Sequence, residues 1–310
     1  YDLNIPSIGI GRVASLGKVI RLRNDIGKYA ISPTMSIIQF NSDMILDYCY
    51  SYMTSSVFQK QFAAQSNGST RQSVGIQHLR ELKIKIPFYR MEQLKIGIFF
   101  ANFDHLIALN QRKLDHLEQK KKGLLQKLFP GKGEHVPQWR FPGFTGEWEE
   151  KKLGDVVDVR SGKDYKQLSE GTIPVYGTGG YMLSVDKALS YNEDAIGIGR
   201  KGTIDKPFVL KAPFWTVDTL FYAVPRENID LIYSYILFQK IDWKKKDEST
   251  GVPSLSKRVI NNTSVMIARL EEQKAIGSYY ATFDHLITLQ RRKLDHLQTQ
   301  KKALLQQLFV

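Results

Sequence analysis

The sequence lacks several features that would fix its class directly. A single cysteine, Cys49, among 310 residues excludes an internal disulfide and a cysteine-cluster metal site, and it favours a reducing compartment. No apolar run approaches the roughly 20 residues of a membrane span, and no signal peptide is visible. These absences together predict a cytoplasmic protein that does not cross a membrane.

The sequence also lacks the motifs of common nucleotide-dependent and methyl-transferring enzymes. It contains no GxxxxGK[ST] phosphate-binding loop and no Asn-Pro-Pro-Tyr or Asp-Pro-Pro-Tyr tetrapeptide. The glycine-rich stretch 129–134 follows an expected helix end, where glycine is typical of a cap. We therefore expect no catalytic residue, no metal site and no cofactor in this chain.

Charge of one sign is in excess. The chain has 44 Lys and Arg against 31 Asp and Glu, a formal net charge of +13, which favours a polyanionic partner. The excess is uneven, because residues 147–271 hold 18 charges of each sign. A nucleic-acid site in that region requires its cations to be segregated onto one face.

The most prominent feature present is a long internal repeat. Residues 92–130 and 272–310 align at a constant offset of 180, and 24 of the 39 positions are identical. Each copy has a seven-residue apolar register, for example Phe100, Ile107 and Leu114 in the first. That register predicts a helix with a narrow apolar seam, and the other copy is the obvious partner. A helix of this length spans at most about 58 Å.

Polar residues interrupt the seam at matching places, with Asn110 opposite Gln290 in the alignment and Lys121 opposite Lys301. Such residues fix the register and orientation of a helix pair at some cost in stability.

Shorter patterns on either side of the first helix indicate small mixed α/β domains. In residues 1–91 we expect strands at 12–23, 36–40 and 79–88 and a helix at 42–65 capped by Ser42 or Asp43. In residues 147–271 we expect strands at 194–210 and 214–225 and a helix at 229–243. Proline, glycine and aromatic residues mark 131–146 as a linker.

The two domains repeat each other as well. The tetrapeptide Gly-Ile-Gly-Arg occurs at 9–12 and at 197–200, and Ser69-Thr70 recurs as Ser249-Thr250. By this alignment residue 1 falls near position 189 of the second unit, so we expect the first domain to be shortened at its start. The fold class expected is α+β: two similar domains, 1–91 and 147–271, separated by two long antiparallel helices with pseudo-two-fold symmetry, 92–130 and 272–310.

The repeated pattern FDHLI…RKLDHL…KK.LLQ.LF, the linker RFPGF.GEWEEKKLGDV, and the shorter IPVYGTGGYM, IGRKGTI and STGVPSLS resemble the DNA-specificity subunit of type I restriction–modification systems. The resemblance covers essentially the whole chain. It implies a non-catalytic subunit whose two target-recognition domains each read half of a bipartite site in double-stranded DNA. It also implies docking of two methyltransferase subunits and of restriction subunits, which would carry S-adenosylmethionine and ATP.

Candidate DNA-binding residues are cations, amides, hydroxyls and aromatics beside glycine-rich or Ser-Thr loops, the side chains suited to phosphates and base edges. They are Arg12, Arg71, Gln72, Lys163, Tyr176, Thr178, Arg200, Lys201, Lys244, Lys245, Lys246 and Thr250. For each of them a plain surface turn or a packing role remains open, most of all for the tyrosine beside its turn.

Candidate spacer and partner-docking residues lie on the long helices at repeat-equivalent positions. They are Phe103, Asp104, His105, Leu114, Asp115 and His116, with Phe283, Asp284, His285, Leu294, Asp295 and His296. The two histidines of one helix are three turns apart, about 16 Å, so they cannot share a metal ion. Partner docking or polar contact between the helices is the expected role.

Two alternatives remain open from the sequence. One is a specificity subunit of a related restriction class with different catalytic partners. The other is a nuclease or recombinase with a coiled-coil arm, against which the lack of a carboxylate cluster speaks.

Overall fold

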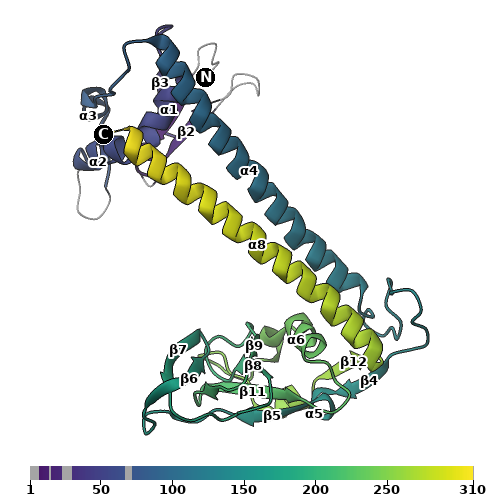
Figure 1. Cartoon of the computed structure of the whole chain (residues 1–310). Coiled ribbons are helices and arrows are strands. Elements are labelled where there is room, and N and C mark those ends of the chain that lie inside the picture. Colours follow the sequence, from purple (N-terminus) through teal and green to yellow (C-terminus); the bar gives the residue numbers. More distant parts are fainter. Residues whose placement is uncertain (1–6, 14, 23–29, 67–71, 310) are drawn as a thin grey trace. The chain divides into compact units, whose positions relative to one another are not determined.

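A computed structural model describes residues 7–13, 15–22, 30–66 and 72–309 (Figure 1). The chain divides into two compact units. Unit 1 comprises Tyr1–His116 and Thr288–Val310, and unit 2 comprises Leu117–Ile287. Each unit therefore contains one small α/β domain together with part of both long helices. Within the described residues, no helix is long and apolar enough to cross a membrane.

The sheet of unit 1 has the strand order β2-β1-β3 and is antiparallel throughout. Its described elements are β1 (Ser7–Gly11), β2 (Val19–Leu22), β3 (Met35–Gln39), α1 (Leu46–Thr54), α2 (Ser56–Ala64) and α3 (Ile76–Glu81). The central strand β1 is buried along its whole length, so it forms the floor of this domain's core. The strand expected at 12–23 is confirmed over β2 and is wrong before it, because residues 15–17 form a bend and a turn.

The helix expected at 42–65 is two helices. The chain is extended at Ser55, whose Oγ accepts a hydrogen bond from the Phe58 amide (3.4 Å) and so caps α2. The expected cap at Ser42 or Asp43 is wrong. The helix begins at Leu46, and the amide of Ile45 instead donates to Oε1 of Gln93 on the long helix (3.2 Å).

The strand expected at 79–88 is also wrong. Residues 76–81 form α3, and 82–87 carry no strand. The equivalent segment of unit 2 is a strand because a second strand pairs with it. A strand needs a ladder partner for its backbone groups, and no described strand lies beside 82–87.

Unit 2 holds a richer domain with three sheets, ordered β5-β11-β8-β9, β10-β6-β7 and β12-β4. Its strands are β4 (Glu149–Lys152), β5 (Val157–Ser161), β6 (Glu170–Gly177), β7 (Gly180–Val185), β8 (Ala195–Gly199), β9 (Phe208–Leu210), β10 (Trp215–Thr216), β11 (Leu220–Pro225) and β12 (Ser264–Ile267). Its helices are α5 (Leu153–Val156), α6 (Leu231–Lys240), α7 (Lys257–Asn261) and the 3-10 turn η1 (Trp243–Lys246).

The two domains share a common frame. The order β9-β8-β11 corresponds to β2-β1-β3, and β5 adds one further strand on β11. The same contacts recur in each domain: Tyr48 donates its hydroxyl proton to the Lys85 carbonyl (2.7 Å), and Tyr233 does so to the Met266 carbonyl (2.9 Å). The sequence-based expectation of two similar mixed α/β domains is confirmed.

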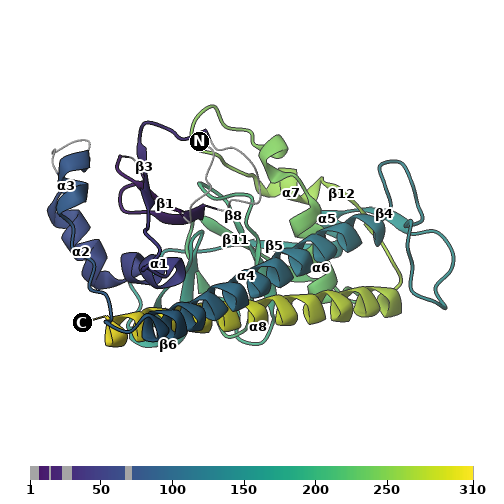
Figure 2. The ribbon, with the colours of Figure 1, turned by 90° about the horizontal axis from the view of Figure 1, so that it is seen from above.

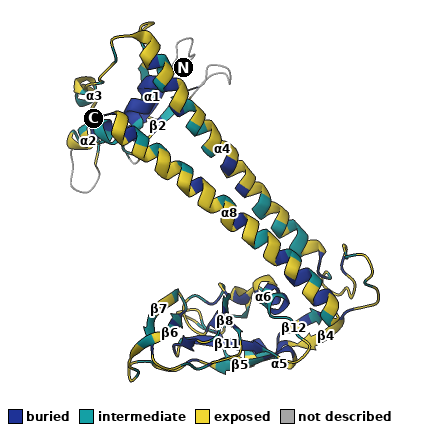
Figure 3. Ribbon diagram, viewed as in Figure 1, coloured by how far each residue is buried: buried dark blue, intermediate teal, exposed yellow. Residues whose placement is uncertain are grey.

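The long helices are α4 (Arg90–Lys127) and α8 (Leu270–Leu308), which lie side by side in both views (Figures 1 and 2). Buried seam residues such as Phe100 and Leu294 alternate with exposed ones along them (Figure 3). In the seam, Nε2 of Gln290 donates to the carbonyl oxygen (3.0 Å) and to Oδ1 (2.9 Å) of Asn110. The helix pair is antiparallel, as the repeat predicts.

An ion pair between the helices occurs twice, at repeat-equivalent positions. The Lys121 ammonium pairs with Asp284 in unit 2, and the Lys301 ammonium pairs with Asp104 in unit 1. Because the offset of 180 turns one pair into the other, these are two copies of a single contact.

Candidate nucleic-acid interface

A hollow at the end of strand β8 brings together predicted residues that are far apart in the sequence. We call it the β8 hollow. It measures about 820 Å³. It is lined by Ser161, Arg200, Lys201, Phe221, Glu248, Ser249, Thr250, Gly251, Val252, Ser254, Leu255, Ser256 and Lys257. Three of the predicted DNA-binding residues, Arg200, Lys201 and Thr250, therefore share one surface.

The backbone around Arg200 is fixed on both sides. Its amide donates to the Thr219 carbonyl (2.8 Å), and its carbonyl accepts from the Leu255 amide (2.9 Å). Gly199 is required just before it, because a Cβ there would lie 2.0 Å from the Thr203 carbonyl oxygen. The Arg200 side chain itself is exposed, and its guanidinium makes a 3.5 Å contact with the Asp218 carbonyl and lies over the Phe221 ring, 5.7 Å from its centroid. A fixed backbone thus presents an exposed guanidinium at the β8 hollow.

The loop that carries Thr250 is organised by Asp247. Its Oδ1 accepts hydrogen bonds from the Ser249 amide (3.0 Å), the Ser249 hydroxyl (2.8 Å) and the Ser254 amide (2.9 Å). These bonds favour the carboxylate and lower the pKa of Asp247. Our sequence analysis did not single out Asp247. An Asp two residues before a Ser in a polar loop is the signal of such a turn.

The β8 hollow carries a positive balance. Arg200, Lys201 and Lys257 supply three cations, and Glu248 supplies one carboxylate, which accepts a hydrogen bond from the Ser256 hydroxyl (2.8 Å). The amino end of α7 also begins here, because Ser256 caps it by accepting from the Val259 amide (3.2 Å). Cations together with hydroxyls suit the binding of phosphate oxygens. Lys257 was missed, since no local pattern links it to Arg200.

Other candidates of unit 2 lie away from the β8 hollow. Lys163 is exposed and follows β5, where its carbonyl accepts from Nε1 of Trp215 (2.9 Å). The Tyr176 ring on β6 packs against Phe208 (6.0 Å between centroids), and Thr178 lies in the turn between β6 and β7.

The three lysines of η1 differ from one another. The Lys244 ammonium pairs with Asp205 (2.8 Å) and that of Lys245 pairs with Asp242 (3.0 Å), both at the surface. Lys246 is half-buried. None of the three lines the β8 hollow.

In unit 1, the equivalent arginine is used differently. The Arg12 guanidinium donates from Nη2 to the Pro33 carbonyl (2.8 Å) and from Nη1 to the Val74 carbonyl (3.3 Å). It therefore ties two loops to the end of β1. Gln72 is exposed, whereas Arg71 lies outside the described residues.

The helix candidates separate into two groups. Leu114 and Leu294 are buried in the seam, and Asp104 and Asp284 are half-buried in the cross-helix ion pairs. Phe103 and Phe283 are half-buried. The remaining six are exposed on the outer faces: His105, Asp115, His116, His285, Asp295 and His296. In the part of the chain that the structure describes, no group of His, Cys, Asp or Glu is arranged to hold a metal ion.

The sequence matches a known protein family over most of its length. Residues 1–119 and 145–299 match the family described as the type I restriction modification DNA specificity domain. The chain belongs to this family. Membership makes it a DNA-specificity component of a type I restriction–modification system.

Relatives and solved structures agree with that assignment. The chain is 25% identical over 318 residues to the type I restriction enzyme MjaVIII specificity subunit of Methanocaldococcus jannaschii, covering 90% of this chain and 73% of the relative. It is 23% identical to a putative type I specificity subunit of Mycoplasma genitalium, covering 85% of this chain and 71% of the relative. A crystal structure of an M. genitalium type I S subunit superimposes with a TM-score of 0.71 at 21% identity, covering 98% of this chain and 83% of that one. The last likeness concerns the fold.

Proposed function

We propose that this specificity subunit reads a bipartite site in double-stranded DNA, that each α/β domain contacts one half of the site, and that the chain performs no catalysis. The observation that carries this proposal is the duplicated cross-helix ion pair. Lys121–Asp284 in unit 2 and Lys301–Asp104 in unit 1 are copies of one contact, so each unit carries the same helix contact beside its own domain. Two copies of one domain in a single chain suit a DNA site made of two separated halves.

The β8 hollow is the proposed reading surface of the second domain. Arg200 is exposed on a fixed backbone, and an arginine in that setting suits bidentate contact with a guanine edge or a phosphate. Lys201 and Lys257 add charge for the DNA backbone, and Thr250 adds a hydroxyl. At 1.5 Å per residue the 39 residues of α8 set an upper limit of about 17 base pairs between the centres of the half-sites.

The outer faces of the helices are the proposed docking surfaces for methyltransferase subunits. Leu106 and Leu109 are 44% and 40% exposed on α4, and their repeat equivalents Leu286 and Leu289 are 43% and 46% exposed on α8. Apolar side chains exposed at matching positions suit a partner. Two equivalent faces suit two copies of one partner, beside His105 and His285. Restriction subunits would join this core, and S-adenosylmethionine and ATP would be bound by those partners.

A DNA-binding measurement tests the reading surface. Arg200→Ala with Lys201→Ala should lower the affinity for the target duplex at least about tenfold and reduce the dependence of affinity on salt by about one unit per lost phosphate contact. The control is Lys211→Ala, which removes an exposed lysine outside the β8 hollow. Unchanged affinity in the double variant would refute the proposed surface.

An assembly measurement tests the docking surfaces. Leu106→Asp should remove one of two methyltransferase subunits, and the addition of Leu286→Asp should remove both, as read by the mass of the complex. Binding of two subunits to the doubly substituted chain would contradict the proposal. Methyl transfer by the purified chain supplied with S-adenosylmethionine would contradict its non-catalytic role.

A further inference from the structure

In unit 2, the linker is held on helix α8 by an arginine between two aromatic residues. Nε and Nη2 of Arg140 donate to the two carboxylate oxygens of Glu272, both at 2.7 Å, and Nη1 donates to the Gly146 carbonyl (2.6 Å). Glu272 is only 1% exposed. A bidentate pair of this kind is among the stronger and more specific polar contacts in proteins.

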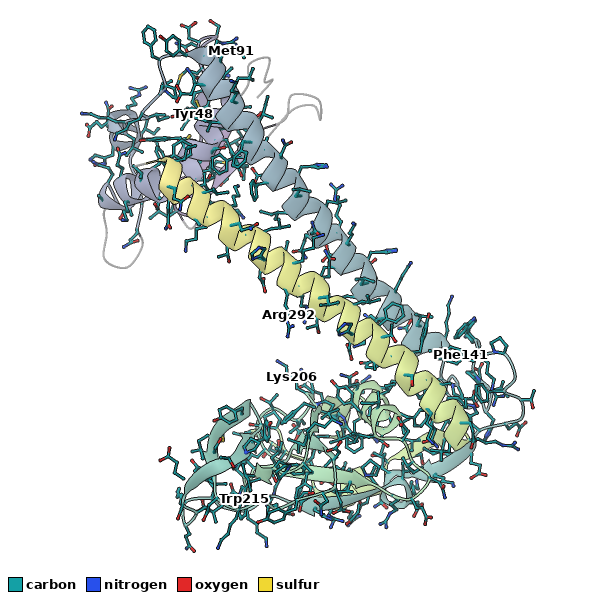
Figure 4. All side chains as sticks on the ribbon, viewed as in Figure 1. Tyr48, Met91, Phe141, Lys206, Trp215 and Arg292 are labelled. Carbon is teal, nitrogen blue, oxygen red and sulfur yellow. The ribbon has the colours of Figure 1, made fainter. Side chains whose placement is uncertain are left out.

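The flanking aromatic side chains cover the apolar surface of the helix pair. The ring centroids of Trp139 and Phe141 are 4.9 Å apart, and both rings contact Tyr279 (6.3 and 5.4 Å between centroids). Figure 4 shows Phe141 beside the first turns of α8. Only about 10 Å³ remains open among Leu124, Leu128, Ile276, Tyr279 and Tyr280. This site on α8 is filled by its own linker.

Among the described residues of unit 1, the repeat-equivalent site on α4 is open. Glu92, which corresponds to Glu272, is exposed, and among the described residues its carboxylate has no ion pair. Phe99, which corresponds to Tyr279, is 46% exposed. Beside it lies a pocket of about 260 Å³, which we call the α4 pocket. It is lined by Lys95, Ile96, Phe99, Phe100, Leu304 and Leu308. Five of these six correspond in the repeat to residues that line the filled site, and the sixth, Lys95, corresponds to Ala275, which does not line it.

Among the described residues, large apolar side chains near the α4 pocket are exposed. Phe88, Tyr89 and Met91, which precede or begin α4, are 92%, 69% and 62% exposed. Figure 4 shows Met91 at this end of α4. Large apolar side chains clustered on a surface around one carboxylate mark an interaction site.

We propose that the α4 pocket binds a polypeptide segment in which an arginine stands between two aromatic residues, in the manner in which residues 139–141 bind α8. The arginine pairs with Glu92, and the aromatic side chains cover Phe99 and fill the α4 pocket. This chemistry is the one that the filled copy of the site displays. The proposal does not depend on the DNA-reading role.

Beyond the α4 pocket, such a segment would meet unpaired strand edges in unit 1, in the order in which the linker of unit 2 meets its pairing strands. There, the linker leads into β4, which pairs with β12, and then into β5, which pairs with β11. The counterparts in unit 1 are residues 82–87, which form no strand, and β3, which pairs only with β1 among the described strands. β11, which pairs with β5, is buried, whereas β3 is only half-buried. Because the counterpart edges in unit 1 are unpaired among the described strands, a longer segment would form backbone hydrogen bonds along them.

The occupant is a separate segment and not the linker of this chain. Residues 139–141 are already bound to α8, and the linker continues directly into Trp148, which packs on Phe129 and Tyr233 in the core. Moving the linker to the α4 pocket would expose the Glu272 site and pull on that core. The tethered linker also holds the α8 site at a high effective concentration, so a free peptide is left to bind the α4 pocket.

Binding of a synthetic peptide tests the proposal. A fluorescently labelled peptide with the sequence of residues 137–146 is titrated into the intact chain, and anisotropy is recorded. We expect saturable binding to one site. Glu92→Gln should weaken it at least about tenfold, because the charge-assisted bidentate contact is lost. A peptide with lysine at the position of Arg140 should also bind less tightly, since lysine cannot make the bidentate contact. A peptide extended to residue 161 should bind more tightly.

The matched control is Ile98→Ser. Ile98 is 49% exposed one residue before Phe99, and the repeat-equivalent residue is Ser278, which does not line the filled site. This variant should bind the peptide as the unaltered chain does. Absence of binding, or equal binding to the Glu92→Gln chain, would overturn the proposal. Self-association of the chain that Glu92→Gln abolishes would also overturn it, because the occupant would then be a second copy.

Discussion

The amino-terminal turns of α4 and α8 have related sequences and different surroundings. Both contain Glu-Gln followed two residues later by Ile-Gly, and in both the glutamine accepts a hydrogen bond from the amide that precedes a shorter helix. Yet Glu272 is buried against Arg140, whereas Glu92 is exposed. The state of a carboxylate here depends on whether a linker covers it. The repeated sequence forms a helix in both places, and the neighbouring segment determines whether the glutamate on it is exposed or buried in an ion pair.

The tetrapeptide Gly-Ile-Gly-Arg gives the same lesson. The Arg12 guanidinium donates hydrogen bonds to two backbone carbonyls, whereas the Arg200 side chain is exposed and lines the β8 hollow. Identical local sequence thus places the arginine side chain in two different settings.

The chain contains a separate natural probe for each unit. All four tryptophans, at 139, 148, 215 and 243, lie in unit 2, so intrinsic tryptophan fluorescence reports on that unit. The only thiol, Cys49, lies buried in unit 1, where burial raises its pKa to about 12. Its reaction with a thiol reagent near neutral pH therefore requires unit 1 to open. The following variants can be read unit by unit.

The largest effect should come from Arg140→Ala. It leaves the Glu272 carboxylate buried without its partner, which should cost about 3 kcal/mol of the unfolding free energy of unit 2. Denaturant unfolding followed by tryptophan fluorescence measures it. Glu92→Gln, which alters the repeat-equivalent carboxylate in unit 1, should alter thiol protection by less than about 0.5 kcal/mol. Equal effects at the two sites would contradict the contrast between them.

A smaller effect should come from Gly97→Ala. A Cβ at this position would lie 2.9 Å from the backbone nitrogen of Tyr48, so α1 must shift, at a cost of about 1–3 kcal/mol in unit 1. The control on the same helix is Gly123→Ala, which meets nothing within 4 Å and should stabilise by up to about 1 kcal/mol. Faster alkylation of Cys49 in the first variant alone is the expected result. Protection unchanged by Gly97→Ala would show that the helices do not approach so closely.

The smallest effects should come from the cross-helix lysines. Lys121→Met and Lys301→Met each remove one copy of the repeated ion pair, and both ammonium groups are largely covered. Because the pairs remain partly exposed, each change should cost about 1 kcal/mol, and the two should agree within about 0.5 kcal/mol. Tryptophan fluorescence measures the effect of Lys121→Met on unit 2, and protection of the Cys49 thiol measures the effect of Lys301→Met on unit 1. A clear difference between the two costs would indicate that the two copies of the ion pair do not contribute equally to stability.

The sequence predicted the long helices well because their signal is local and repeated many times. The heptad spacing of Phe100, Ile107 and Leu114 indicates a helix from local sequence alone. Asn110 and Gln290, which are equivalent in the repeat, form a hydrogen bond with each other in the seam. The family and the two-domain plan followed from the same repeat.

Features that depend on distant partners were not predictable. The strand expected at 79–88 has the right alternation, but no strand of the described residues pairs with it. The break at Ser55 depends on capping geometry. In the candidate site, Arg200 and Thr250 were singled out, but Lys257 joins them only through the fold. The clamp of Arg140 on Glu272 joins residues 132 positions apart, and nothing in the local sequence announces it.

The most direct test of the central claim is an exchange of residues 147–271 for the same region of another specificity subunit, followed by mapping of the methylated sites in cells that carry the methyltransferase. The two-reader account predicts that one half of the bipartite site changes, while the other half and the spacing between them stay the same. A change in both halves, or in neither, would contradict it.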